Sequence, residues 1–567
     1  MRFLTRHSVI CFLLTLMVVG CAGPASSSPQ APRFESERTS TPKRIRAAIQ
    51  GEPRTLSRTM NGNVGRVRGV NELELLVHAG LSVEDDNGNR RPQLAEAVPS
   101  IENGLWRVLP DGRMETTWRI RDRTSWHDGT RFTADDMVFT AAVGQDNDLA
   151  VFTHPGFDAL ESVRAVDPRT VLVTWKRPFF GADLMFTSED NFAMPLPRHL
   201  LEKPFLEDKS GFSDLLYWTN DFVGAGPFKV REYLPGSRMT LQAHDSFPLG
   251  RPKIDEIEVR FIPDLNALVA NLLAGEIELT IGRALSAENA FQLRDRWTEG
   301  TVMTQPGDSW TAFYPQHVNP NPPAIADARF RRALMHSINR QELVDELQHG
   351  LTVVAHSMIS PNRGEYRDVE QSIVRYDYDP RRTAQMLEEI GFARGADGAF
   401  RDAAGQRLSV EVRSTGGDDF RDKELLSITD QWLRAGVGAE PVFIPRQRAN
   451  DREYRVTRPA FEVVSQGTTP SDLENIHTRT VPSAETRWVG ANRGRYSNAE
   501  FDALVDRFFV TVPRGERMGV LAQIIRHMTD QLVVMGLYFT PNATGVSNRL
   551  RNVPTSNPWN AHEWDVR

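Results

Sequence analysis

Cysteine is nearly absent from this chain of 567 residues. Its two copies, Cys11 and Cys21, lie near the N-terminus, so the rest of the chain has no pair of thiols to oxidise. That absence permits an oxidising compartment without proving one. The chain also has no strong excess of one charge, because the formal net charge is −7, and arginine is scattered along the chain. This balance argues against nucleic acid as a partner.

Sequence signatures of catalysis are also missing. The chain contains no G-x-S-x-G elbow, no G-x-x-x-x-G-K-[ST] loop, no H-E-x-x-H and no C-x-x-C. The spacing of His317, His336, His349 and His356 is too irregular to indicate a local metal cage. We therefore expect a protein that is not an enzyme and that has no metal site and no cofactor.

The apolar run at residues 9–19 is too short to span a bilayer comfortably. The residues just before Cys21 are small and apolar, as a lipoprotein signal peptidase requires before the cysteine at which it cleaves. We predict a signal peptide over residues 1–21 and lipidation of Cys21, with an uncleaved anchor as the alternative. Residues 22–42 are rich in Ser and Pro and predict a flexible tether.

The remaining ~520 residues exceed what one core usually supports, so two or three lobes are expected. Several local signals agree over residues 105–139. A Pro-Asp-Gly turn at 110–112 precedes alternating apolar and polar residues over 114–121, which is the pattern of a half-buried strand. Farther on, Thr133 can cap a helix, and the carboxylate of Asp136 can return the bond.

Strands and helices alternate in the rest of the chain. Asp264 can cap a helix over 265–272, Gly275 ends it, and a strand begins at Glu276. Strand, helix and strand in this order imply a crossover unit with a covered sheet, which is typical of α/β lobes.

Residues 327–350 carry the clearest helical pattern in the chain. An apolar stripe, with Arg331 and Arg332 on the solvent-exposed side, predicts a first helix. Asn339 can cap a second helix, which Gly350 ends.

Three stretches resemble the family 5 extracellular solute-binding proteins, the peptide-, dipeptide- and nickel-binding components of ABC importers. They are W-R-I-R-D-R-T-S-W-H-D-G-T-R-F-T-A-D-D-M-V-F-T at 118–140, G-A-G-P-F at 224–228 and F-R-R-A-L-M-H-S-I-N-R-Q-E-L-V at 330–344. The resemblance extends from about residue 43 to the C-terminus. It implies a two-lobed, periplasmic-binding-protein-like α/β fold of the large, three-subdomain type with a hinge.

The resemblance also implies domain boundaries. Lobe I is expected to comprise residues 43–76, 224–310 and 535–567, with a small inserted subdomain at 77–223 and lobe II at 311–534.

One aspartate is the main candidate for ligand binding. In the peptide-binding members of this family, a strand ends in a Trp-containing loop, and an aspartate a few residues on receives the α-ammonium group of the peptide. Here the strand is expected over 461–464, and Asp472 falls at the position of that aspartate. Helix capping is the alternative role for Asp472. Gln466, a second ligand-binding candidate in the same loop, stands where those members usually have Trp, which weakens the case for a dipeptide.

Other candidates come from two places. One set lies just before the helices at 327–350, where such proteins cross between lobes, and the other ends a strand, where open α/β sheets bind ligands. For all of them, packing is the alternative to ligand contact. They are Trp310, Thr311, Tyr314, Ser414 and Thr415.

The predicted function is that of a substrate-binding lipoprotein of an ABC importer. It captures a peptide or similar small polar solute in the cleft by hinge closure and delivers it to permease subunits. We expect a monomer in the cell envelope or periplasm, held to the membrane only through the lipid on Cys21. The alternatives are an envelope ligand sensor or chaperone-like lipoprotein of the same fold, or a secreted hydrolase. The ligand itself stays open among a peptide, a nickel complex, an opine-like amine and a sugar.

Overall fold

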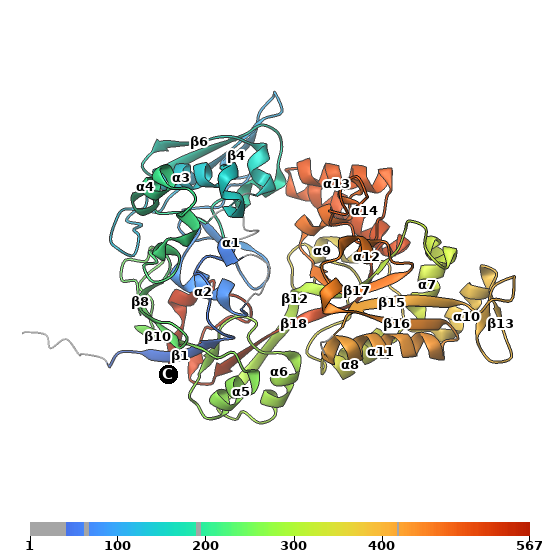
Figure 1. Ribbon diagram of the computed structural model, residues 1–567. Coiled ribbons are helices and arrows are strands. Elements are labelled where there is room, and N and C mark those ends of the chain that lie inside the picture. The colour runs from blue at the N-terminus through green and yellow to red at the C-terminus, as the bar shows by residue number, and fades with distance from the viewer. Residues whose placement is uncertain (1–40, 62–66, 153, 189–193, 417–418) are drawn as a thin grey trace, which may run out of the picture. The chain divides into compact units, whose positions relative to one another are not determined.

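Two long strands run through the fold, β12 (Gly300–Pro315) and β18 (Met535–Ser547). They pair in antiparallel fashion, and their register shifts between Pro306 and Trp310. In the computed structural model, residues 41–61, 67–152, 154–188, 194–416 and 419–567 are described. The predicted signal peptide, Cys21 and nearly all of the predicted tether lie outside them. Figure 1 shows the elements named below.

Ten strands of the described residues form one mixed sheet, and β12 and β18 lie in its middle. Parallel pairs occur on both sides of these two strands, β1 with β10 and β11 on one side, β15 with β16 and β17 on the other. The strand order is β16 (Gly438–Ile444), β15 (Ser409–Thr415), β17 (Phe461–Gly467), β12, β18, β11 (Leu279–Thr280), β1 (Arg44–Ile49), β10 (Glu256–Phe261), β9 (Arg238–Ala243) and β8 (Phe228–Leu234).

The two ends of this sheet have separate cores, which define the two lobes of an α/β fold. In lobe I, apolar residues of β1, β9 and β10 pack with α2 (Val70–Val77), while α5 (Leu265–Leu273) and α6 (Ala287–Arg294) build a neighbouring cluster. In lobe II, strands β15 and β17 pack with helices on one side of the sheet, and β12 packs with helices on the other. These helices are α7 (Ala328–His336), α8 (Arg340–Leu347), α10 (Pro380–Glu389), α11 (Asp419–Arg434), α13 (Ala499–Val510) and α14 (Arg514–Gln531).

A second sheet has its own core, in which Trp118, Trp126 and Trp175 are fully buried. Its strands, in order, are β4 (Trp106–Val108), β5 (Met114–Arg119), β7 (Thr170–Trp175) and β6 (Leu160–Asp167), and α3 (Ala134–Gly144) packs on β6 and β7. Apolar residues of α4 (Arg198–Glu207) and of the segment after it join the core of lobe I instead. These residues of the predicted inserted subdomain therefore pack in the core of lobe I.

Short elements complete the described residues. They are α1 (Arg58–Asn61), β2 (Ser82–Glu84), β3 (Arg90–Pro92), α9 (Tyr366–Val369), β13 (Ala393–Arg394), β14 (Phe400–Arg401), α12 (Arg452–Val456), β19 (Leu550–Arg551) and β20 (Asp565–Val566).

The predicted helix caps are confirmed. Thr133 and Asp136 form a capping box at the start of α3. Asp264 accepts a hydrogen bond from the third residue of α5, and Asn339 does the same for α8. Gly275 follows α5 with φ 69°, a left-handed conformation in which a side chain is strained.

Two predictions about local structure are wrong. The side chain of Arg331 is not solvent-exposed, because its guanidinium turns inward and donates to the carbonyls of Ile325, Gln531 and Leu532. The strand predicted over 461–464 extends to Gly467, since pairing with β12 continues to Ser309. Gln466 therefore lies in a strand and not in a loop.

The glycines at 224 and 226 are explained by a close approach of two backbone segments. A Cβ atom on Gly224 would lie 2.0 Å from the carbonyl oxygen of Val77, and one on Gly226 would lie 2.4 Å from the amide nitrogen of His78. Only glycine allows the chain to pass here.

Among the residues that the structure describes, no helix has both the length and the apolar character needed to cross a bilayer.

Candidate functional site

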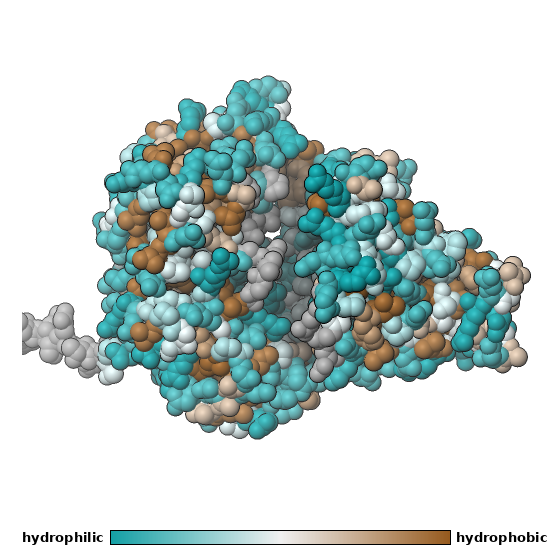
Figure 2. All heavy atoms as spheres, in the orientation of Figure 1, coloured by the Kyte–Doolittle hydropathy of each residue, from teal (hydrophilic) through white to brown (hydrophobic). Residues whose placement is uncertain are grey.

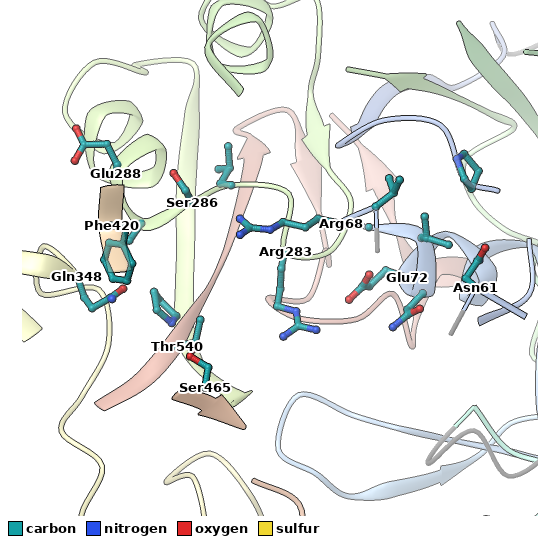
Figure 3. Close-up of a pocket in the computed structure, with 18 of the residues that line it drawn as sticks. Asn61, Arg68, Glu72, Arg283, Ser286, Glu288, Gln348, Phe420, Ser465 and Thr540 are labelled. Atoms are coloured by element: carbon teal, nitrogen blue, oxygen red, sulfur yellow. The ribbon is translucent and has the colours of Figure 1, made fainter. Parts of the chain in front are cut away.

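A cavity of about 1090 Å³ lies where β12 and β18 change register. This volume is slightly above the roughly 300–1,000 Å³ that is common for small-molecule sites. Figure 3 shows side chains from both lobes around it, and in Figure 2 hydrophilic residues border the hollow on the lobe II side. The lining residues come from 52–54, 61, 67–72, 219–220, 233, 283 and 285–288 in lobe I, from 311, 347–349, 420–421, 424 and 465 in lobe II, and from 538, 540 and 541 on β18.

Two hydroxyl groups from neighbouring strands form part of the lobe II wall. Thr311 on β12 lies directly opposite Ser465 on β17, and their hydroxyl oxygens are 3.1 Å apart. Directly opposed residues of antiparallel strands project to the same face of the sheet. This pair therefore offers the cavity donors and acceptors that a rigid sheet holds in place.

A buried carboxylate lies behind the same wall. The hydroxyl of Tyr538 on β18 donates to Oε1 of Glu424 on α11, and each side chain is 1% exposed. Burial, together with the charge of Glu424, holds the pKa of Tyr538 well above its ordinary value. Tyr538 consequently keeps its proton and acts as a donor to the carboxylate.

The lobe I wall carries more charge. Glu52 accepts a hydrogen bond from the hydroxyl of Tyr233 at 2.6 Å. Glu288 on α6 pairs with the ring of His349 at 2.7 Å, and Phe291 of the same helix stacks on that ring at 4.4 Å. Because His349 follows α8, this contact joins a helix of lobe I to the end of a helix of lobe II.

The predicted residues Trp310, Tyr314 and Gln466 are not among the residues that line the cavity. Trp310 is opposite Gln466 in the β12–β17 pair, one position along from Thr311 and Ser465, so these two side chains project from the other face of the sheet. Trp310 and Tyr314 are buried in an apolar cluster of lobe II. Of the predicted group on β12, Thr311 is the one that reaches the cavity.

Asp472 is not among the lining residues either. Its carboxylate accepts the backbone N–H of Thr469 at 2.9 Å and the hydroxyl of Thr469 at 2.8 Å, and these bonds complete a capping box. The side chain of Asn475 donates to the other carboxylate oxygen at 3.2 Å. Capping is thus what the structure shows for Asp472, and its contact with a ligand stays a prediction.

Ser414 and Thr415 end β15 next to β16, and neither is a lining residue of the cavity. Ser414 is buried. Over the described ranges, no group of three or more His, Cys, Asp or Glu is arranged to hold a metal ion.

Sequence reasoning missed several cavity residues, and for one of them a signal was present. Glu424, Ile428 and Trp432 are buried along one face of α11 at positions i, i+4 and i+8. A carboxylate on a stripe that is otherwise apolar needs a partner or a function. Tyr538 and Gln348 gave no comparable signal, because their role depends on contacts between segments far apart in the sequence.

Comparison with known proteins gives a consistent picture. Residues 91–484 match the model of the bacterial extracellular solute-binding proteins, family 5 Middle. The oligopeptide-binding protein AppA of Bacillus subtilis is 23% identical over 577 residues, which covers 99% of each chain. The dipeptide-binding protein of Escherichia coli is 26% identical over 76% of this chain and 79% of that protein.

Solved structures agree on the fold. AppA of B. subtilis in complex with a nonapeptide has a TM-score of 0.64 and 21% identity, and covers 93% of this chain and 100% of that one. NikZ of Campylobacter jejuni in complex with Ni(L-His) has a TM-score of 0.67 and 20% identity, with the same coverage. The family model spans more than half of the chain, and the fold and the cavity between two α/β lobes agree with it. The chain belongs to the family 5 bacterial extracellular solute-binding proteins.

Proposed function

We propose that this protein captures a peptide or a similar small polar solute in the cavity and delivers it to the permease of an ABC importer. The observation that carries the proposal is the cavity itself, which both lobes line with hydroxyl, carboxylate and guanidinium groups. Relatives whose names include oligopeptide-binding and dipeptide-binding proteins support a peptide as the solute.

Capture occurs by closure of the two lobes. A solute that touches both walls stabilises the closed form in proportion to its higher affinity for that form. The place where β12 and β18 change register, next to the lining residues Thr540 and Pro541, is where the two lobes flex. No group in the site is assigned to breaking a bond of the solute, and the permease recognises the closed form.

The protein works outside the cytoplasmic membrane as a lipid-anchored monomer. Lipidation of Cys21 holds it at the membrane, and the tether over residues 22–42 lets the lobes turn toward a permease.

The test begins with the solute that the protein carries. Purified mature protein is denatured, and the released material is analysed by mass spectrometry. The stripped and refolded protein is then offered a random mixture of three- to eight-residue peptides. Peptides retained at about one per protein molecule support the proposal. Retention of none, or the appearance of cleaved products, contradicts it.

A further inference from the structure

Arg283 lies on a segment that the lobe I core holds in place. On either side of it, Ile281 and Leu285 are buried. The amide of Ile281 donates to the carbonyl of Ala48 at 2.9 Å, and Gly282 adopts φ 64°. The backbone that carries Arg283 is therefore anchored, and its side chain leaves a fixed point of the cavity wall.

The guanidinium of Arg283 extends into the cavity from lobe I (Figure 3). Within the described ranges, no hydrogen bond or ion pair engages it. Three carboxylates of the lining already have donors: Glu52 has Tyr233, Glu288 has His349, and Glu424 has Tyr538.

Glu72, an acid on the same wall, is not the partner of Arg283. The carboxyl carbon of Glu72 lies 2.4 Å from the place where a Cβ atom on Gly282 would be, so the carboxylate packs against the backbone next to Arg283. No ion pair joins Glu72 to Arg283, although both side chains are half-buried. A half-buried, unpaired guanidinium on an anchored backbone can bind a planar anion through two parallel N–H···O bonds.

We propose that Arg283 binds a carboxylate of the solute and thereby orients it against the hydroxyl-rich wall of lobe II. The carboxylate belongs to the C-terminus of a peptide or to an acidic side chain. This inference rests on the proposed function, because it concerns the solute that fills the same cavity.

The experiment uses three peptide mixtures of three to eight residues. One lacks Asp and Glu and has free C-termini, the second is its C-terminal amide, and the third is the amide with Glu included. Retention by wild type, Arg283→Gln and the control Arg296→Gln is measured by mass spectrometry at a series of peptide concentrations. Arg296 is an exposed arginine of lobe I that does not line the cavity.

For wild type we expect retention of at least one carboxylate-bearing mixture to be roughly 10- to 100-fold tighter than that of the plain amide. Arg283→Gln should remove this difference and leave retention of the plain amide mixture unchanged. Arg296→Gln should retain all three mixtures as wild type does. A free C-terminus or a Glu side chain as the preferred group identifies the source of the carboxylate.

Three results would overturn the inference. They are equal wild-type affinity for all mixtures, a difference that persists in Arg283→Gln, and an equal loss of all mixtures in that variant. Retention of no peptide by folded wild-type protein, as judged by circular dichroism, instead contradicts the proposed function itself.

Discussion

The guanidinium of Arg331 ties the N-terminal end of α7 to the segment that leads into β18. It donates to the carbonyls of Ile325, Gln531 and Leu532, and its side chain is 3% exposed. Arg331→Met would leave these acceptors without their donor, so we expect the free energy of unfolding to fall by about 2–4 kcal/mol. Urea denaturation followed by circular dichroism measures the change.

Arg329 in the same helix is the matched control. Its side chain is 63% exposed and pairs with Asp327 at 2.7 Å. Because exposed ion pairs contribute little, Arg329→Met should cost less than about 1 kcal/mol. If both variants lowered the free energy of unfolding equally, the buried contacts of Arg331 would contribute no more stability than the exposed ion pair of Arg329.

The wrong prediction for Arg331 shows that the spacing of apolar residues along a helix does not determine where a long polar side chain ends. The pattern in 327–350 predicted α7 and α8 and their polar starts correctly, because these depend on neighbours along the chain. Where a long side chain ends depends on the carbonyls that a distant segment brings near it. In the same way the sequence indicated that Asp472 could cap a helix, but it did not indicate which residue would form a hydrogen bond with Glu424.

At the scale of elements, three histidines surround the glycine turn at 224–226. His78 accepts the backbone N–H of Ala225 at 3.3 Å, and its other ring nitrogen lies 2.8 Å from the carbonyl of Pro195. His127 accepts the backbone N–H of Gly224 at 3.2 Å, and its other ring nitrogen lies 3.1 Å from the carbonyl of Gly226. His244 contacts the carbonyl of Gly226 at 3.0 Å. A neutral imidazole can accept on one nitrogen and donate on the other, whereas a protonated one can only donate.

This arrangement predicts a loss of stability in acid. Burial lowers the pKa of His78 to about 4 from its ordinary 6.5, and it also lowers those of His127 and His244. Since the unfolded chain takes up these protons first, the stabilisation is complete above about pH 6.5 and is lost as the pH falls toward the folded pKa. His78 adds about 1.4 kcal/mol per pH unit to the slope in that window, and His127 and His244 act in the same direction.

Urea denaturation at several pH values between 7.5 and 4.5 checks this prediction. His78→Gln should have a shallower pH slope than wild type, by about the contribution of one histidine. The same slope in both proteins would mean that His78 does not titrate between the folded and unfolded states.

The strands show how far sequence patterns could locate the site. The sequence pointed to the region of β12 that lines the cavity, because the resemblance to the family implied that the chain crosses between the lobes there. It could not choose between Trp310 and Thr311, since the face depends on where the register of β12 shifts against β18. The strand that carries Ser465 was predicted too short for the same reason: its pairing partner is more than 150 residues away in the chain.

For the whole molecule, the resemblance to the family and the alternation of strands and helices predicted a two-lobed α/β fold, which the structure and the relatives confirm. That a single sheet would continue from one lobe to the other through β12 and β18 was not predictable, because it depends on pairing between residues 300–313 and 535–547. The proposed domain boundaries stay predictions, and the apolar residues of α4 that join the lobe I core show where they need testing.

The central claim is that the two lobes close around a solute. The most direct measurement is small-angle X-ray scattering of the stripped mature protein, before and after saturation with the peptides that it retains. We predict a smaller radius of gyration for the saturated protein. Superimposable scattering curves, with occupancy established by mass spectrometry on the same samples, would contradict the account.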